Sequence, residues 1–264
     1  FLYCILTIWN EQVNVSKIEN TFRTARNKAR RTVKRILKSF HGKINEMNDL
    51  CIGGGGINGI SFVGALEYIH QNKLLDLKRF YGCSIGSLIG ILYISGFSPT
   101  SILSTIINID AAKFVKYDFS NINTNNSLLD SGSLIKLIDN LDEHKDTTIK
   151  QFSDKYGVDI NIYATNINTD EYTSFNKENF PEIILKDAIL ASMSVPFIFP
   201  PVKIRENYYI DGCIKNILGS PPKEICILGY SIILANVTKS YMGTVIKSMI
   251  KNELPNSLYI IECD

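Results

Sequence analysis

The sequence has few of the residues that build disulfide-rich or zinc-stabilised domains. Its 264 residues include six cysteines, and none of them are arranged with the C-x-x-C spacing typical of a zinc site. Several of these cysteines lie in apolar, strand-like runs, where a free thiol behaves as a small hydrophobic side chain. The pattern argues against a disulfide framework and favours a reducing, cytoplasmic location.

The sequence also lacks an apolar run long enough to cross a membrane, which takes roughly 20 residues. Residues 1–9 are almost wholly apolar, but the run ends there. Two interpretations remain open. These residues are either the end of a truncated anchor with a basic cytoplasmic flank, or an apolar element that packs on the body of the protein.

The net charge of +2 is small, but it hides an uneven distribution. Residues 1–43 carry a net charge of +8, whereas residues 44–264 carry −6. Within residues 17–40, apolar side chains recur every three or four positions between Arg and Lys, which predicts a basic amphipathic helix. Such a helix could contact an anionic membrane or a nucleic acid, or it could be a solvated helix that docks by its apolar stripe. Aromatic interleaving and known nucleic-acid motifs are lacking, so we expect no nucleic-acid partner.

Residues 1–47 are therefore interpreted as an extension, and residues 48–264 as the main domain, where strand and helix patterns alternate. We expect strands at 49–52, 79–81, 158–164, 171–175, 208–210, 224–234 and 257–262, helices at 60–71, 85–95, 134–141, 184–192 and 241–250, and a buried proline-rich turn at 195–202. This alternation predicts an α/β domain with a mostly parallel central sheet and helices on both faces.

Two glycine-rich turns carry the clearest chemical signal. The second, at 82–86, has the pattern G-x-S-x-G and follows a short strand. Gly82 and Gly86 remove side chains that would collide in a sharp strand-to-helix bend, so the hydroxyl of Ser84 is presented at the N-terminus of a helix. That end of a helix favours a developing negative charge. The spacing predicts a nucleophilic serine, although a structural turn with an idle serine has the same pattern.

The first turn, at 53–59, is almost entirely glycine. The backbone amides of Gly54, Gly55 and Gly56 could form an oxyanion hole. The same G-x-G-x-x-G spacing occurs in dinucleotide-binding folds, which also need an acidic residue at the end of the second strand. Asp76 has nearly the right spacing but precedes the expected strand at 79–81, so it lies at the wrong end.

Histidine, the usual base beside a nucleophilic serine, is scarce. The three histidines are His41, His70 and His144, and none follows an acid near the C-terminus as an α/β-hydrolase triad requires. We expect all three on the solvated surface. A triad through His144, oriented by Asp130 or Asp139, is the remaining histidine alternative.

A carboxylate is the other candidate for the base. Asp211 follows an apolar strand and precedes Gly212, after the proline-rich turn. A free aspartate is a weak base at neutral pH, but burial raises its pKa. This hypothesis makes Asp211 the group that accepts the proton of Ser84. An aspartate that only forms a turn has the same local pattern, so both interpretations remain.

Together these segments resemble the patatin-like phospholipase family over roughly residues 48–215. The shared motifs are the loop glycines Gly54, Gly56 and Gly59, the nucleophile turn Gly82-Cys83-Ser84-Ile85-Gly86, the segment from Asp187 through Ser192 to Pro196, Phe199, Pro200 and Pro201, and Asp211-Gly212-Cys213. Two positions depart from the family pattern. Asn58 stands where the family often has Lys or Arg, and Cys213 stands where it has Ala or Gly.

The resemblance implies a three-layer sandwich and a Ser84–Asp211 dyad that hydrolyses acyl esters of phospholipids or related lipids without a metal or other cofactor. Calcium-loop spacing of acidic residues is likewise absent from the sequence. We therefore expect a phospholipase A or lysophospholipase. The alternatives are a catalytically decayed lipid-binding protein of this fold and a nucleotide-binding module that uses the glycine loop.

Overall fold

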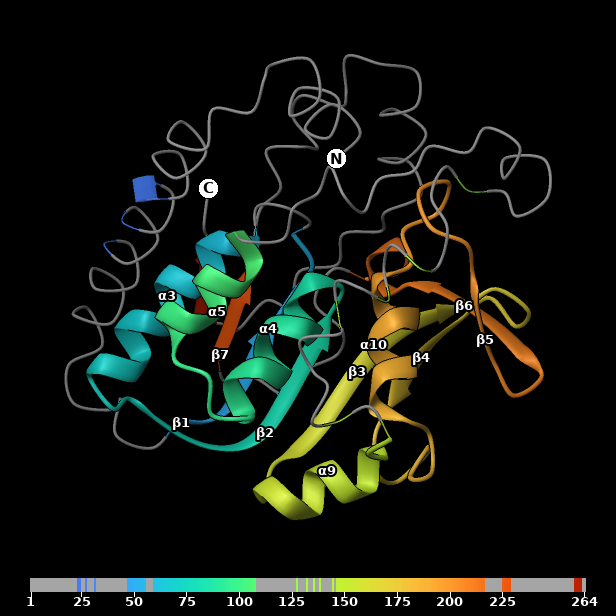
Figure 1. Cartoon of the computed structure of the whole chain (residues 1–264), viewed down its shortest axis with the longest axis horizontal. Coiled ribbons are helices and arrows are strands. Elements are labelled where there is room, and N and C mark those ends of the chain that lie inside the picture. Colours follow the sequence, from blue (N-terminus) through green and yellow to red (C-terminus); the bar gives the residue numbers. More distant parts are fainter. Residues whose placement is uncertain are drawn as a thin grey trace.

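The computed structural model describes the central part of the chain and several short segments outside it (Figure 1). The described residues are 47–55, 59–107, 146–216, 225–228 and 259–262, with the single positions 23, 24, 27, 31, 127, 132, 135, 138 and 144. All structural statements below concern these residues.

An eight-stranded mixed sheet forms the centre of the described chain. Its strands are β1 (Met47–Ile52), β2 (Leu75–Cys83), β3 (Asp159–Asn166), β4 (Glu171–Phe175), β5 (Val202–Ile204), β6 (Asn207–Asp211), β7 (Ile225–Leu228) and β8 (Tyr259–Glu262). They are ordered β5-β6-β3-β2-β1-β7-β8, and β4 also pairs with β3. The pairings from β8 to β3 are parallel, whereas β3–β4, β3–β6 and β5–β6 are antiparallel. The sheet therefore changes direction at β3.

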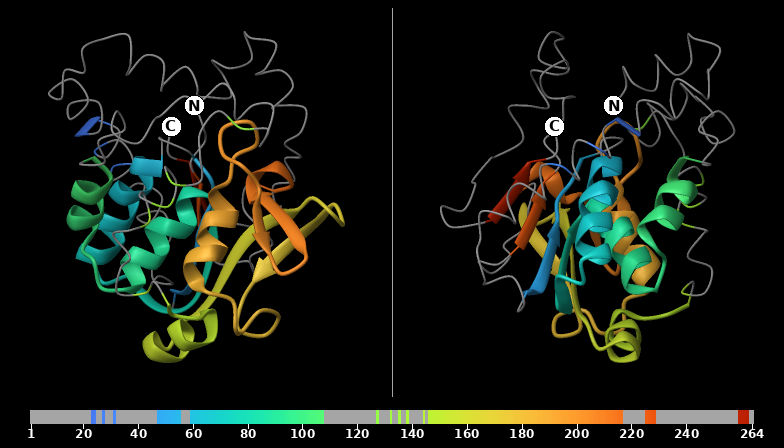
Figure 2. Two further views of the ribbon diagram at one scale, coloured as in Figure 1. Left: turned by 45° about the vertical axis from the view of Figure 1, so that its right-hand side comes forward. Right: turned by 90° about the vertical axis from the view of Figure 1, so that its left-hand side faces the viewer.

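Three helices pack against a single face of this sheet (Figure 2). They are α3 (Ile60–Gln71), α4 (Ile85–Ile94) and α10 (Leu185–Met193). A fourth helix, α5 (Pro99–Ile107), packs on α3 and α4. Most of α4 is buried, which agrees with its composition of isoleucine, leucine and small residues. The separate helix α9 (Ile149–Tyr156) leads into β3 and begins with a capping box between Thr148 and Gln151.

Side chains of the parallel strands alternate between the two faces of the sheet. On one face, the strand side chains pack against the helices and form the main core with them. They include Leu50, Ile52, Phe80, Ile160 and Ile162. The intervening residues Cys51, Tyr81, Cys83 and Tyr163 form a second buried cluster on the opposite face. Both faces are therefore covered where the strands carry the two glycine-rich turns.

The α/β class and the mostly parallel central sheet expected from the sequence are confirmed. The layer of described helices covers one face of the sheet, and the helices expected on the other face stay a prediction. Within the basic segment 17–40, the positions 23, 24, 27 and 31 are helical and exposed. The rest of that segment, the apolar residues 1–9 and the expected helix at 241–250 lie outside the described residues. No described helix has both the length and the hydropathy needed to cross a bilayer.

Three elements differ from the expectation. β2 begins at Leu75 rather than near residue 79, because its first half alternates with charged residues and is partly exposed. Helix α9 was not expected, since it has only eight residues and its apolar stripe consists of Ile149, Phe152 and Tyr156 between polar residues. The short strand β5 overlaps the end of the segment expected to be a turn, and it pairs with β6 at the sheet edge. In all three cases the apolar pattern is short or interrupted by charged residues.

Candidate active site

Ser84 occupies the sharp turn that joins β2 to α4. Its backbone angles, φ 54° and ψ −133°, lie in a region that non-glycine residues rarely adopt, at a cost of about 1–3 kcal/mol. The Ser84 amide donates to Ser192 Oγ at 2.8 Å. The Ser84 carbonyl accepts from the amide of Ser87 at 2.9 Å and from its hydroxyl at 2.6 Å. Bonds to α10 and α4 therefore hold the turn in its strained form.

The start of α4 lies directly against the end of β1, and Gly86 makes this approach possible. A Cβ atom at Gly86 would lie 2.2 Å from the carbonyl oxygen of Ile52 and 2.4 Å from that of Gly53. Both contacts are far closer than van der Waals packing allows. The two glycine-rich turns therefore touch, and the N-terminus of α4 faces the site that they enclose.

Pairing along β3 explains how Asp211 reaches the serine. β4 pairs with residues 162–166 of β3 and so occupies one edge of that segment. On the other edge, β2 pairs as far as Cys83 with Tyr163, and β6 pairs antiparallel as far as Asp211 with Ala164. Since Tyr163 and Ala164 are consecutive, the ends of β2 and β6 meet there.

The Ser84 hydroxyl donates a hydrogen bond to Asp211 Oδ2 at 2.5 Å. The other carboxylate oxygen, Oδ1, accepts from the amide of Cys213 at 2.8 Å. The Asp211 amide donates to the carbonyl of Ser194 at 2.8 Å, and the hydroxyl of Thr165 donates to the Asp211 carbonyl at 3.2 Å. Ser84 is 6% exposed and Asp211 2% exposed. Three residues besides Ser84 therefore hold Asp211, and the pair is almost sealed from solvent.

Burial raises the pKa of the Asp211 carboxyl from 3.8 to about 6, because the charged form loses its hydration. The hydrogen bonds from Ser84 and from Cys213 oppose this rise, since they favour the carboxylate. A carboxyl group with a pKa close to neutrality can both accept a proton and return it during a reaction.

The glycine loop lies beside the serine. A Cβ atom at Gly54 would be 3.3 Å from Ser84 Cβ, and one at Gly55 would be 3.1 Å from the Phe62 ring. Gly56 and Asn58 lie outside the described residues. The other motif glycines are Gly59 just before α3, Gly82 at the end of β2 and Gly212 directly after Asp211. Gly54 is thus next to the nucleophile, and the role of the loop amides as an oxyanion hole stays a prediction.

A family model described as patatin-like phospholipase matches residues 50–218. The chain belongs to this family. The match covers both glycine-rich turns and Asp211. It therefore includes every described residue of the site.

Individual relatives are distant and longer. A protein named probable lipid hydrolase 463L, from Invertebrate iridescent virus 6, is 28% identical over 185 residues, which are 67% of this chain and 63% of that protein. Uncharacterized protein R571 of Acanthamoeba polyphaga mimivirus is 28% identical over 174 residues, 64% of this chain and 58% of that protein. The chain thus spans less than two thirds of the length of either viral relative.

The crystal structure of VipD from Legionella pneumophila has a similar fold. It has a TM-score of 0.53 at 15% identity, over 70% of this chain and 50% of VipD. At this identity the likeness extends to the fold alone.

The described histidines of this patatin-like chain lie away from the serine. His144 is 3% exposed, so the expected surface position is wrong for this residue. Its Nε2 atom lies 3.1 Å from Ser95 Oγ, at the end of α4 opposite to Ser84, about 15 Å along the helix. His70 is exposed and contacts Tyr93. His41, Asp130 and Asp139 lie outside the described residues.

The end of α10 supplies contacts that were not predicted from the sequence. Ser192 Oγ accepts from the Ser84 amide and donates to the carbonyl of Tyr163 at 2.6 Å, while the Ser194 carbonyl accepts from the Asp211 amide. One helix end therefore holds both members of the pair. The only sequence signal was the position of Ser192 in the family motif, which by itself indicates no role.

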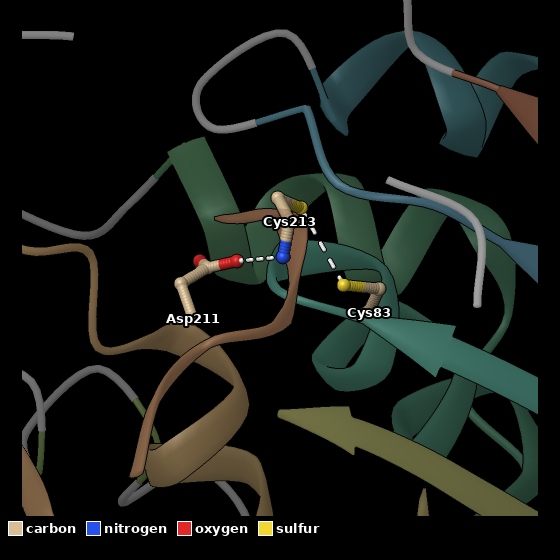
Figure 3. Close-up of side chains that lie close together, drawn as sticks. All are labelled: Cys83, Asp211 and Cys213. Atoms are coloured by element: carbon tan, nitrogen blue, oxygen red, sulfur yellow. Dashed lines mark hydrogen bonds between the residues drawn. The ribbon is translucent and has the colours of Figure 1, made fainter. Parts of the chain in front are cut away.

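Among the described residues, Cys83, Asp211 and Cys213 offer possible metal-ligating atoms within 4.8 Å of one another (Figure 3). The two sulfur atoms are 3.4 Å apart. These residues directly flank or form the Ser84–Asp211 pair, so the chemistry of the two thiols bears on the site.

Proposed function

We propose that the chain is a lipid acyl hydrolase of the phospholipase A or lysophospholipase type, in which Ser84 is the nucleophile and Asp211 the base. The hydrogen bond from Ser84 Oγ to the buried Asp211 carboxylate carries this proposal. Membership of the patatin-like phospholipase family and the similarity to a probable lipid hydrolase support a lipid ester as the substrate class.

In the first half of the reaction, Ser84 Oγ attacks the ester carbonyl carbon while its proton moves to Asp211 Oδ2. The carbonyl oxygen gains negative charge, which the amides of Gly54, Gly55 and Gly56 and the N-terminus of α4 stabilise. When the tetrahedral intermediate collapses, the proton on Asp211 passes to the departing alkoxide of the lipid. An acyl ester of Ser84 remains.

In the second half, a water molecule gives a proton to Asp211 and attacks the acyl carbon. The second intermediate collapses, the proton returns to Ser84 Oγ, and a fatty acid is released. Asp211 ends each half in the state in which it began, so no metal ion or external base enters the scheme.

Recruitment to an anionic membrane through residues 17–40 stays a prediction, since only scattered positions of that segment are described.

Ser84→Ala and Asp211→Asn are each expected to abolish fatty-acid release, read by mass spectrometry on a panel of phospholipids, lysophospholipids and glycerides. Ser101→Ala on α5 and Asp154→Asn on α9 are matched controls, because both residues are exposed and remote from the pair. Circular dichroism melting of each variant separates loss of chemistry from loss of fold.

A fluorophosphonate probe tests the nucleophile directly. It should label Ser84 in the parent protein and leave Ser84→Ala unlabelled. Turnover similar to the parent by a folded Ser84→Ala or Asp211→Asn protein would refute the assignment. Lipid binding without labelling or hydrolysis would instead favour a decayed enzyme.

A further inference from the structure

Two thiols meet beside the catalytic pair. Cys83 directly precedes Ser84, and Cys213 lies two positions after Asp211. Their Sγ atoms are 3.4 Å apart although the residues are 130 positions apart in the chain. Since a disulfide has an S–S length of about 2.05 Å, the sulfurs need to approach by less than 1.5 Å to bond.

The space around Cys213 is shaped by glycine. A Cβ atom at Gly54 would lie only 1.9 Å from Cys213 Sγ, so the thiol rests on the bare backbone of the glycine loop. Cys83 is fully buried, whereas Cys213 is partly exposed, so Cys213 is the member of the pair closer to solvent. The two sulfurs thus lie where three segments meet: the turn with the nucleophile, the segment after Asp211 and the glycine loop.

Figure 3 shows the two sulfur atoms facing each other, with the Asp211 carboxylate turned to the backbone nitrogen of Cys213. A metal ion shared by the three residues would compete with the hydrogen bonds that the Asp211 carboxylate accepts from Ser84 and from the Cys213 amide. The geometry favours a bond between the sulfurs over a three-ligand metal site.

We propose that Cys83 and Cys213 form a reversible disulfide that switches the active site off. The switch concerns the hydrolase activity and so rests on the proposed function, whereas the disulfide itself does not.

A hydroperoxide is a sufficient oxidant. The partly exposed Cys213 thiolate attacks the peroxide oxygen and becomes a sulfenic acid, releasing hydroxide from hydrogen peroxide. Cys83 then attacks that sulfur, its proton leaves with the hydroxyl as water, and the S–S bond forms. Two thiols lose two electrons and hydrogen peroxide becomes two waters; a dithiol reverses the step.

Formation of the bond would disturb the base. Cys83 is fixed in β2 by its pairing with Tyr163, and the next amide, that of Ser84, is held by Ser192. Most of the movement therefore falls on Cys213, whose amide holds Asp211 Oδ1. Because a misplacement of about 1 Å at a catalytic group can cost about 100-fold in rate, we expect at least a ten-fold loss of turnover.

The test exposes the whole reduced chain to hydrogen peroxide and measures ester hydrolysis and tryptic peptides in parallel. Burial raises the pKa of the Cys83 thiol, and the hydrogen bond with Cys83 raises that of the Cys213 thiol. Because the thiolate is the reactive form, oxidation by peroxide is slow at neutral pH and is followed over hours. We expect a peptide linked through Cys83 and Cys213, a matching loss of activity, and recovery of both after dithiothreitol.

Cys213→Ser is the matched control, since it removes one sulfur and keeps the other five cysteines and the backbone amide. Each protein is compared with its own reduced rate, and the oxidant should leave the rate of this variant unchanged. The proposal is overturned by absence of the linked peptide, by full activity of the linked protein, or by equal inactivation of Cys213→Ser.

Zinc chloride replaces the oxidant in a parallel arm. Inhibition by zinc, together with absence of the linked peptide in the peroxide arm, would assign the thiols to metal binding and overturn the disulfide. A reduced protein without ester hydrolysis would count against the proposed function, while the linked peptide is still scored by mass.

Discussion

At the scale of single residues, the most consequential feature is a carboxyl group with almost no access to water. Asp211 makes hydrogen bonds to Ser84 and to the Cys213 amide, yet burial still outweighs them and raises its pKa to about 6. The same desolvation that strengthens Asp211 as a base makes its charge costly to the fold.

The rate of hydrolysis should therefore depend on the ionisation of Asp211. Because the carboxylate is the active base, kcat/KM should fall at acid pH and rise to a plateau through an apparent pKa near 6. The measurement is a pH profile of kcat/KM on a soluble ester whose own chemistry is constant over the range. A profile that is flat between pH 5 and 8 would contradict the role given to Asp211.

Ser192 should behave as a positioning residue. In Ser192→Ala the Ser84 amide loses its acceptor and the strained turn relaxes, so we expect kcat to fall about 10- to 100-fold with KM little changed, and stability to fall by about 1–3 kcal/mol. Ser194→Ala is the matched control, since that hydroxyl bonds only within α10 to Leu190 and the Ser194 carbonyl that holds Asp211 is kept.

If the role of Ser192 were purely structural, Ser192→Ala and Ser194→Ala would both have lower melting temperatures. Both would then keep the kcat of the parent at temperatures where they are folded. That result would remove Ser192 from the account of catalysis.

At the scale of elements, the site exists because α4 begins against the end of β1 and because α10 ends beside both β2 and β6. The first contact depends on how closely the backbone of α4 approaches that of β1 at Gly86. The second depends on the hydroxyl of Ser192 and the carbonyl of Ser194, which hold the amides of Ser84 and Asp211.

Gly86→Ala should move α4 away from β1. The added Cβ would clash with the carbonyls of Ile52 and Gly53, so we expect a loss of more than about 3 kcal/mol in the free energy of unfolding and no detectable hydrolysis. Gly157→Ala is the control for loss of a glycine. It places its Cβ in open space, and its left-handed φ of 65° costs only about 1–2 kcal/mol.

Urea unfolding of the two variants decides between these effects. Since Gly86 lies in a helix and Gly157 has a left-handed φ, equal destabilisation would show that the clash at Gly86 is relieved at little cost, and it would contradict the close approach of α4 as the reason for this glycine.

At the scale of the whole molecule, Asp211 links activity to stability. Its pKa is higher in the folded chain than its ordinary value of 3.8, so the protonated group contributes stability that is fully present below about pH 4 and is lost as pH rises through 6. A difference of about 2 pKa units corresponds to about 3 kcal/mol.

Asp211→Asn should therefore be more stable than the parent at pH 8, by up to about 3 kcal/mol, and no more stable at pH 4. The difference between the two urea midpoints as a function of pH isolates this one group, because the other titrations are common to both proteins. A constant difference at all pH values would contradict the raised pKa.

Much of the fold could be read from the sequence because its elements have strong local signals. The apolar runs before the glycine turns, the helix after Ser84 and the hairpin at β3–β4 were all located from periodicity. The short elements α9 and β5, with eight and three residues, were not. His144 was also misplaced, because a charged local sequence gives no sign that Phe152, Tyr156 and Ser95 enclose its ring.

The sequence by itself determined the family, the α/β class and the residue types able to perform acyl transfer, since these follow from motifs whose spacing is local. Only the tertiary structure decided that the hydroxyl and the carboxyl group meet, that Ser192 holds the turn, and that two thiols lie together. These contacts depend on β2 and β6 sharing one edge of β3, and pairing between distant strands leaves no periodic trace along the chain.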